Sequence, residues 1–95
     1  RSDKAEATRI GRVLVEEKLA ACANVLDGMT SVYRWQGEVC EDAETVLIAK
    51  TTDALAVALT ERVKALHSYD CPCIVTLPIA GGNTAFLDWI AAQTT

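Results

Sequence analysis

Apolar residues recur along the first twenty positions with the spacing of an α-helix. Asp3 and Glu6 have the spacing of a helix-capping box, so we expect the helix to begin here. Gly11 lies inside the helix and costs roughly 1 kcal/mol relative to alanine, so we predict that it permits close packing. The apolar stripe consists of Ala7, Ile10, Val13, Leu14 and Ala21.

The next segment has the shorter period of β-strands. Residues 22–26 and 30–36 are predicted as two strands, with a turn at Asp27-Gly28 between them. In the second strand, Tyr33 and Trp35 fall on one face. This segment therefore predicts a pair of neighbouring strands.

A hairpin tip and a third strand follow. Gly37-Glu38 and Glu41-Asp42 indicate a turn-rich tip. Residues 44–51 then form a strand that is apolar on both faces between Val46 and Ala49, which is typical of a strand covered on both sides.

The second helix is predicted to begin at a cap on Thr52 or Asp53. It should end near Ser68, because Pro72 restricts Cys71 to extended geometry. One face of this helix carries Leu55, Leu59, Val63 and Leu66.

The last third of the chain predicts a strand and a short helix. Residues 73–79 are rich in β-branched and apolar side chains, which favours a strand. Gly81-Gly82 breaks the chain, and Asn83 or Thr84 caps the final helix. Phe86, Leu87 and Ile90 are expected to anchor that helix.

This order of elements predicts an α+β fold in a single domain over residues 1–95. One further strand in front would complete the ferredoxin-like β-α-β-β-α-β sandwich, here with an extra C-terminal helix. That strand would lie centrally in the sheet, so we expect residues before Arg1 to supply it. The crossover between residues 44–51 and 73–79 should be right-handed.

Composition narrows the function classes. The 95 residues carry a net charge of −4 with the basic residues scattered, which argues against a nucleic-acid surface. We find no apolar run long enough for a membrane span and no secretory signal, so we expect no membrane partner and a cytoplasmic location. The four cysteines are expected to be reduced thiols.

Several short strings together resemble one family. They occur in order along most of the chain, and they are KLAACAN (18–24), SVYRWQG (31–37), Lys50-Thr51, HSYDCPC (67–73), GN (82–83) and FLDWI (86–90). This set resembles the CutA family of divalent-cation-tolerance proteins. The resemblance implies a homotrimer of ferredoxin-like subunits, with sheets meeting around a threefold axis and long hairpins crossing between neighbours. It also implies a role in tolerance of divalent metals, copper above all.

The chain departs from the family pattern at informative positions. Ser68 replaces the usual proline after His67, Cys73 replaces a glutamate, and Phe86 replaces a tyrosine. The resemblance also implies copper ligands in the first strand and at two adjacent histidines. Leu66 occupies the first of those histidine positions, so only His67 carries over.

The candidate metal ligands are His67, Cys71 and Cys73. Residues two apart on an extended chain point the same way, so both thiols can face one ion. Thiolate sulfur with one imidazole suits Cu(I) or Zn, although no cofactor is obligatory. The alternative is structural, with the cysteines filling small apolar positions and His67 capping a helix C-terminus.

A second candidate site consists of polar and aromatic side chains. In the resembling family, Tyr33, Trp35, Lys50 and Tyr69 correspond to segments that line a cleft between subunits. Such a cleft could hold a small anion or a nucleotide-like molecule, with Lys50 supplying charge and Trp35 a stacking surface. The alternative is that these side chains only pack an interface, where aromatic residues are enriched.

The residues offer little from which to build an enzyme, because there is a single histidine and no phosphate-binding loop. Two hypotheses follow. The chain is either a metal-binding trimer that responds to divalent ions, or a trimeric interaction or ligand-sensing module that uses the clefts between subunits.

Overall fold

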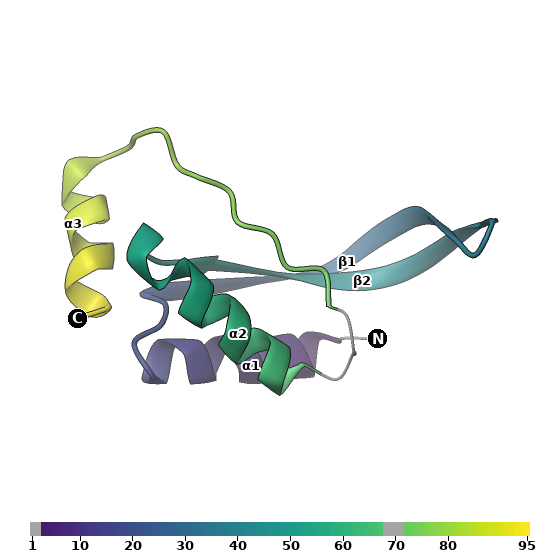
Figure 1. Cartoon of the computed structure of the whole chain (residues 1–95), viewed down its shortest axis with the longest axis horizontal. Coiled ribbons are helices and arrows are strands. Elements are labelled where there is room, and N and C mark those ends of the chain that lie inside the picture. The colour runs from purple at the N-terminus through teal and green to yellow at the C-terminus, as the bar shows by residue number, and fades with distance from the viewer. Residues whose placement is uncertain (1–2, 68–71) are drawn as a thin grey trace.

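The computed structural model describes residues 3–67 and 72–95, which form a small mixed α/β fold. A helix precedes a long β-hairpin, and two further helices follow it (Figure 1). The elements are α1 (Lys4–Glu16), β1 (Cys22–Trp35), β2 (Glu38–Lys50), the 3-10 turn η1 (Asp53–Leu55), α2 (Ala56–Leu66) and α3 (Thr84–Gln93).

The hairpin is a single antiparallel ladder that runs from the Cys22–Lys50 pair to the Trp35–Glu38 pair. Its turn is Gln36-Gly37, where φ is 50° and 81°. Positive φ at both central residues matches the twist of the strands and makes a tight two-residue turn. The hairpin tip is therefore shorter than expected, and residues 41–42, predicted within it, belong to β2.

The predicted turn at Asp27-Gly28 is wrong, because β1 continues through it as one strand. The register shifts between Leu26 and Met29, and Gly28 has a φ of 83°. The Asp27 carboxylate accepts hydrogen bonds from the Gly28 amide and the Thr45 hydroxyl, both at 3.0 Å. These bonds fix a bulge, in which glycine supplies the positive φ without reversing the chain.

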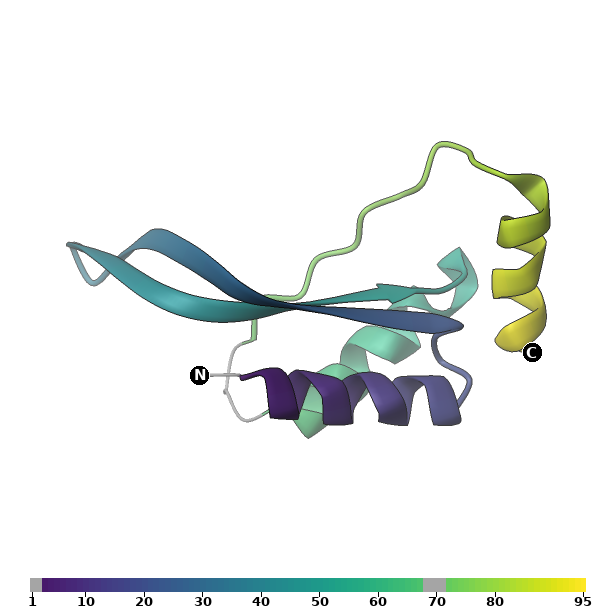
Figure 2. The ribbon, with the colours of Figure 1, turned by 180° about the vertical axis from the view of Figure 1, so that it is seen from behind.

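Helices α1 and α2 cover one face of the hairpin, and its turn end projects past both of them (Figures 1 and 2). Gly11 makes the close approach possible. A Cβ built on this glycine would lie 3.1 Å from the Ala23 Cβ and 3.3 Å from the Leu47 Cδ1. The prediction that Gly11 permits close packing is confirmed.

The core lies between α1, α2 and this face of the sheet. Ile10, Leu14, Ala20 and Val63 are buried together. Leu59 and Leu66, from the predicted stripe of the second helix, pack against this cluster, as do Leu19, Leu47, Ala49 and Ile74. The apolar period of both helices thus identified their core faces correctly.

α1 begins as predicted and ends earlier than its apolar stripe suggested. The Asp3 side chain accepts a hydrogen bond from the Glu6 amide at 2.8 Å. The helix ends at Glu16, because Lys18 has a φ of 62° and turns the chain back toward the sheet. Ala21 is buried, but it lies beyond the helix.

An ion pair joins the end of α1 to α2. The Arg62 guanidinium donates two hydrogen bonds to the Glu17 carboxylate, at 2.8 and 2.7 Å. These bonds lower the pKa of Glu17. Thr52 occupies the cap position before η1, but its side chain makes no capping hydrogen bond. α2 ends at Leu66, two residues before the predicted end at Ser68, which lies outside the described residues.

The predicted strand at residues 73–79 is absent. This segment is extended but has no ladder partner, and it leads to α3 beyond the Lys50 end of the hairpin (Figure 1). A strand needs a neighbour for its backbone hydrogen bonds, and the described residues provide none alongside it. Leu77 consequently stays 81% exposed.

α3 starts where predicted, and its apolar residues divide between core and solvent. The Asn83 side chain accepts a hydrogen bond from the Ala85 amide at 2.9 Å. Ile90 is buried and Leu87 is half-buried, whereas Phe86 remains 43% exposed. Phe86, which was expected to anchor the helix, contacts the Lys50 ammonium of β2 and does not enter the buried core.

The opposite face of the hairpin carries neither α1 nor α2. Because side chains alternate, residues next to those that contact α1 point the other way. Ile48 and Leu26 lie on this bare face and are exposed. The prediction that residues 46–49 are covered on both sides is therefore wrong for the chain alone.

Replacing Gly11 with alanine is expected to lower the free energy of unfolding, although alanine is the better helix former. The new Cβ would meet the Ala23 Cβ, which is fixed to the strand backbone, so α1 would have to shift. Overpacking of this kind costs about 1–3 kcal/mol. The gain in helix propensity is about 1 kcal/mol, so we expect a net loss.

Urea denaturation followed by circular dichroism at fixed protein concentration measures this effect. Gly81→Ala is the matched control, because the same change there meets open space and no positive φ. We expect Gly81→Ala to be neutral or stabilising. An equal gain in stability for both variants would contradict the close-packing role of Gly11.

Candidate functional site

Two of the three predicted metal ligands line one cavity. His67 and Cys73 both border a cavity of about 440 Å³, together with Pro72. The remaining wall is mostly apolar and comes from α1, β2 and α2, with Met29 of β1 and the segment after Cys73. Cys71, the third predicted ligand, lies outside the described residues. The structure thus brings an imidazole and a thiol to the same space.

The position of His67 follows from the end of α2. His67 is the C-cap residue, with φ −76° and ψ 147°, and its amide donates to the Val63 carbonyl at 2.8 Å. The predicted position of this histidine at a helix C-terminus is confirmed. The extended backbone at His67 therefore ends the helical conformation of α2.

The described cysteines are free thiols that lie in three different places. Cys73 is exposed beside the cavity, and Cys22 and Cys40 are half-buried on the hairpin. Cys40 lies between the two pairs that were predicted as the hairpin tip, but the shorter turn places it within the ladder, opposite Tyr33. Among residues 3–67 and 72–95, no three His, Cys, Asp or Glu side chains converge as a metal site.

The predicted cleft residues do not meet within one chain. Tyr33 pairs with Cys40 on β2, ten residues from Lys50 along that strand. At about 3.3 Å per residue, this separation is roughly 30 Å. Trp35 is farther still from Lys50, and Tyr69 lies outside the described residues. A site that used Lys50 and Trp35 together would need more than one chain.

Tyr33 is fixed near the tip by a hydrogen bond across the ladder. Its hydroxyl donates to the Asp42 carboxylate. This bond, with some loss of hydration and the negative charge of Asp42, raises the pKa of Tyr33 to about 12. Trp35, by contrast, is 63% exposed.

Lys50 has polar and aromatic neighbours that the sequence did not reveal. Its ammonium donates to the Asn24 Oδ1 at 2.8 Å and lies 5.9 Å from the centre of the Phe86 ring. Phe86 in turn stacks with Trp89, with ring centres 5.7 Å apart. The spacing of three residues puts both rings on one side of a helix, but nothing in the sequence places that helix beside Lys50.

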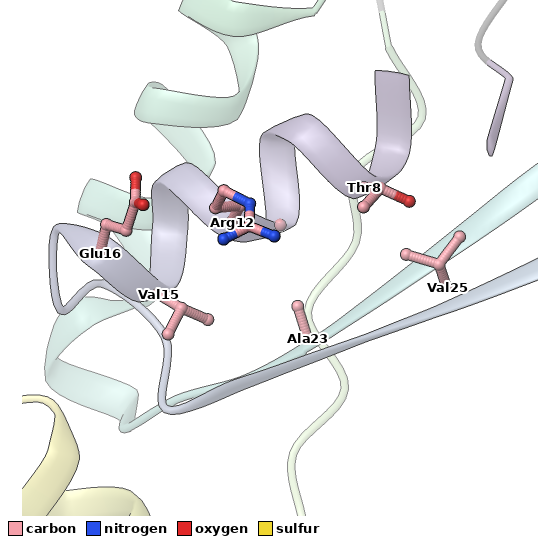
Figure 3. A pocket seen from close by; sticks show the side chains of 7 residues that line it. Thr8, Arg12, Val15, Glu16, Ala23 and Val25 are labelled. Carbon is pink, nitrogen blue, oxygen red and sulfur yellow. The ribbon is translucent and has the colours of Figure 1, made fainter. Parts of the chain in front are cut away.

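A second pocket, of about 310 Å³, lies between α1 and β1. Figure 3 shows Arg12 among Thr8, Val15 and Glu16 on the helix, with Ala23 and Val25 on the strand. This groove contains none of the residues that the sequence singled out for chemistry.

Within the part of the chain that the structure describes, no helix is long and apolar enough to cross a membrane.

The fold and its two groups of candidate residues define a small α/β protein built on a long antiparallel hairpin. A family model described as CutA1 divalent ion tolerance protein matches residues 1–93. The chain is 57% identical over 88 residues to the divalent-cation tolerance protein CutA of Thermus thermophilus, covering 93% of this chain and 85% of that protein. The chain belongs to the CutA1 divalent ion tolerance family.

Solved structures agree with this assignment. The fold superimposes on the divalent cation tolerance protein (Cut A1) of Thermus thermophilus with a TM-score of 0.93 and 54% identity, over 98% of this chain and 90% of that chain. This chain is also 48% identical to the chloroplastic protein CutA 1 of Oryza sativa. The match covers 97% of this chain and 52% of that relative. The family is named for tolerance of divalent ions and not for a reaction.

Because of its hydrogen bond, we expect the Tyr33 phenol to lose its proton at a higher pH than an ordinary tyrosine. Its folded pKa of about 12 exceeds the ordinary value of 10.0, so the contact stabilises the fold below pH 10. That stabilisation is lost as pH rises through about 12. Asp42→Asn removes the charge and should return the pKa of Tyr33 toward its ordinary value.

Ultraviolet absorbance of tyrosinate checks this shift. A Tyr69→Phe background leaves Tyr33 as the reporter, since these are the two tyrosines of the chain. Glu41→Gln removes a neighbouring carboxylate of β2 that is not bonded to Tyr33 and serves as the control. Identical titration curves with and without Asp42→Asn would contradict the role of the hydrogen bond.

Proposed function

We propose that this protein contributes to divalent metal tolerance by binding a soft metal ion directly, through His67, Cys71 and Cys73. The supporting observation is that His67 and Cys73, six positions apart in the sequence, line the same cavity. Cys71 would add the second thiolate, because two side chains spaced by two residues can face one ion where the chain is extended.

The chemistry of this donor set favours Cu(I) or Zn(II). Thiolates and imidazole are soft to borderline ligands, and both metals accept low coordination numbers or tetrahedral sites of this kind. The cysteines must lose their protons on binding, so affinity should rise with pH. We place this activity in the cytoplasm, where reducing conditions keep the thiols available. The role is binding, without catalysis.

We further propose a homotrimer of ferredoxin-like subunits. The bare face of the hairpin exposes Leu26 and Ile48, and a small chain gains burial by covering such a face with further copies. Cys40 and Lys50 are an even number of residues apart on β2, so Lys50 and Tyr33, the partner of Cys40, share this face. Contact between copies through this face would therefore bring Tyr33 of one copy close to Lys50 of another and form a cleft between them.

The ferredoxin-like sheet would fill the apolar cavity beside β2 with a further strand, and His67 and Cys73, which line that cavity, would then border the strand. β2 pairs with β1 along one edge, and residues from β2 and the segment that begins at Pro72 both line this cavity. A strand placed there would pair with β2 on one side and with residues 73–79 on the other. It would complete the β-α-β-β-α-β order and cover apolar side chains now exposed.

A second candidate function is small-ligand sensing at the clefts between subunits, without direct metal binding. The observation that favours it is the aromatic and amide environment of Lys50. Tyr33, Trp35 and Tyr69 from neighbouring copies would contribute the remaining wall. This function needs the trimer but does not need the cysteines.

The metal proposal is tested by titrating the reduced chain with Cu(I) and with Zn(II) against a chelating competitor. We expect about one ion per chain, because one donor set of this type fills one site. Cys71→Ser/Cys73→Ser should abolish this binding. The control Cys22→Ser/Cys40→Ser removes as many thiols from the hairpin and should leave it intact. Equal binding by both double variants would refute the proposed ligands.

The trimer is tested by light scattering at micromolar concentration. We expect three times the chain mass of 10.2 kDa. Leu26→Glu puts a charge on the bare face and should dissociate the assembly, because burial of an unpaired charge is unfavourable. Val57→Glu is the control, since Val57 is exposed on α2. A monomeric parent chain, or a trimer that tolerates Leu26→Glu, would contradict the proposed interface.

A further inference from the structure

Lys50 holds a positive charge that no carboxylate neutralises among the described residues. The ion pairs there involve Arg9, Arg62 and Lys64, and Lys50 takes part in none of them. Its ammonium has three hydrogen-bond donors, of which one goes to Asn24. Two donors therefore remain available to a ligand or to water.

The amide of Asn24 is oriented by this contact. Because its Oδ1 accepts from Lys50 and from the Cys22 thiol, its Nδ2 group is the donor of this side chain. The pairing of Cys22 with Lys50 and of Asn24 with Ile48 makes Asn24 and Lys50 diagonal neighbours on the bare face. Two neighbouring nitrogen donors on one sheet face suit an oxyanion.

An aromatic surface adjoins these donors. The ring of Phe86 lies beside the Lys50 ammonium, and Trp89 extends the surface by stacking at an interplanar angle of 21°. The two residues are 43% and 42% exposed, so part of each ring remains open to a stacking partner. Exposed apolar surface next to a polar group is found at ligand-binding and protein-binding sites.

We propose that Lys50, Asn24, Phe86 and Trp89 form a binding site for a small anion that carries a planar aromatic ring, such as a nucleoside phosphate. The anionic group would contact the Lys50 ammonium and the Asn24 amide. The ring would stack on the exposed aromatic surface, which favours planar groups of any base. This inference deepens the ligand-sensing function proposed above and is independent of the metal site.

Because the net charge of the chain is negative, we expect anions to bind at the Lys50 site and not elsewhere on the surface. With a charge of −4, the protein as a whole repels anions, so weak attraction spread over the surface is not expected. Binding would have to depend on the local donors. Removal of Lys50 should therefore affect it far more than removal of another lysine.

The test uses the full chain with adenosine monophosphate as the probe. The two tryptophans of the chain, Trp35 and Trp89, serve together as the fluorescent reporter, so neither is replaced. We expect saturable quenching by the nucleotide. Inorganic phosphate carries the anion alone and adenosine carries the ring alone, and each should bind at least about tenfold more weakly.

Matched variants identify the donors. Lys50→Met should weaken nucleotide binding by about tenfold or more, because charge-assisted hydrogen bonds are lost. Lys64→Met, at an exposed lysine already paired with Glu61, should have no effect. Asn24→Asp keeps the side-chain size but repels the anion, and it should also abolish binding. Phe86→Leu should weaken the binding of the nucleotide more than the binding of phosphate.

The inference is overturned by an absence of quenching at millimolar nucleotide, by unchanged binding in Lys50→Met, or by phosphate or adenosine that binds as well as the nucleotide. Metal titration and light scattering on the same samples keep the failures separate. A trimer that binds metal but not the nucleotide would refute this site alone. A parent chain that is monomeric would instead contradict the proposed trimer, on which the ligand-sensing function depends.

Discussion

The close contact of α1 with the hairpin at Gly11 is the constraint on which the rest of this structure depends. The helix can approach the Ala23 and Leu47 side chains only because no Cβ intervenes. This approach places Ile10 and Leu14 in the core and fixes which face of the sheet is buried. Strict alternation along the strands then dictates that Asn24, Ile48 and Lys50 face the other way.

The length of the hairpin determines where the aromatic side chains of its tip lie. Its tight turn at Gln36-Gly37 extends the ladder beyond the helices, so the tip holds Tyr33 and Trp35 far from Lys50. Tyr33 is held across the ladder by Asp42, whereas Trp35 projects into solvent. A ladder that extends past its own core leaves apolar side chains exposed in the single chain. The proposed trimer would gain burial from this surface.

The two candidate sites differ in how the fold supports them. His67 and Cys73 line one cavity, the first as the C-cap of α2 and the second on the segment that leads to α3. Lys50 meets Phe86 because α3 stands at the open end of the hairpin. The first site uses positions close together in the sequence, and the second joins residues distant in the sequence. The two proposed sites share no residue.

Local features of this protein could be predicted from its sequence. The Asp3 and Asn83 caps, the apolar stripes of α1 and α2, and the role of Gly11 follow from side-chain chemistry and helical period, which act over a few residues. Family strings identified its relatives for the same reason, since they are contiguous. The tertiary structure alone decided that Asp27-Gly28 is a bulge, that residues 73–79 form no ladder, and that Phe86 lies beside Lys50. Those outcomes depend on which backbone or side chain is available across space, and a linear pattern does not contain that information.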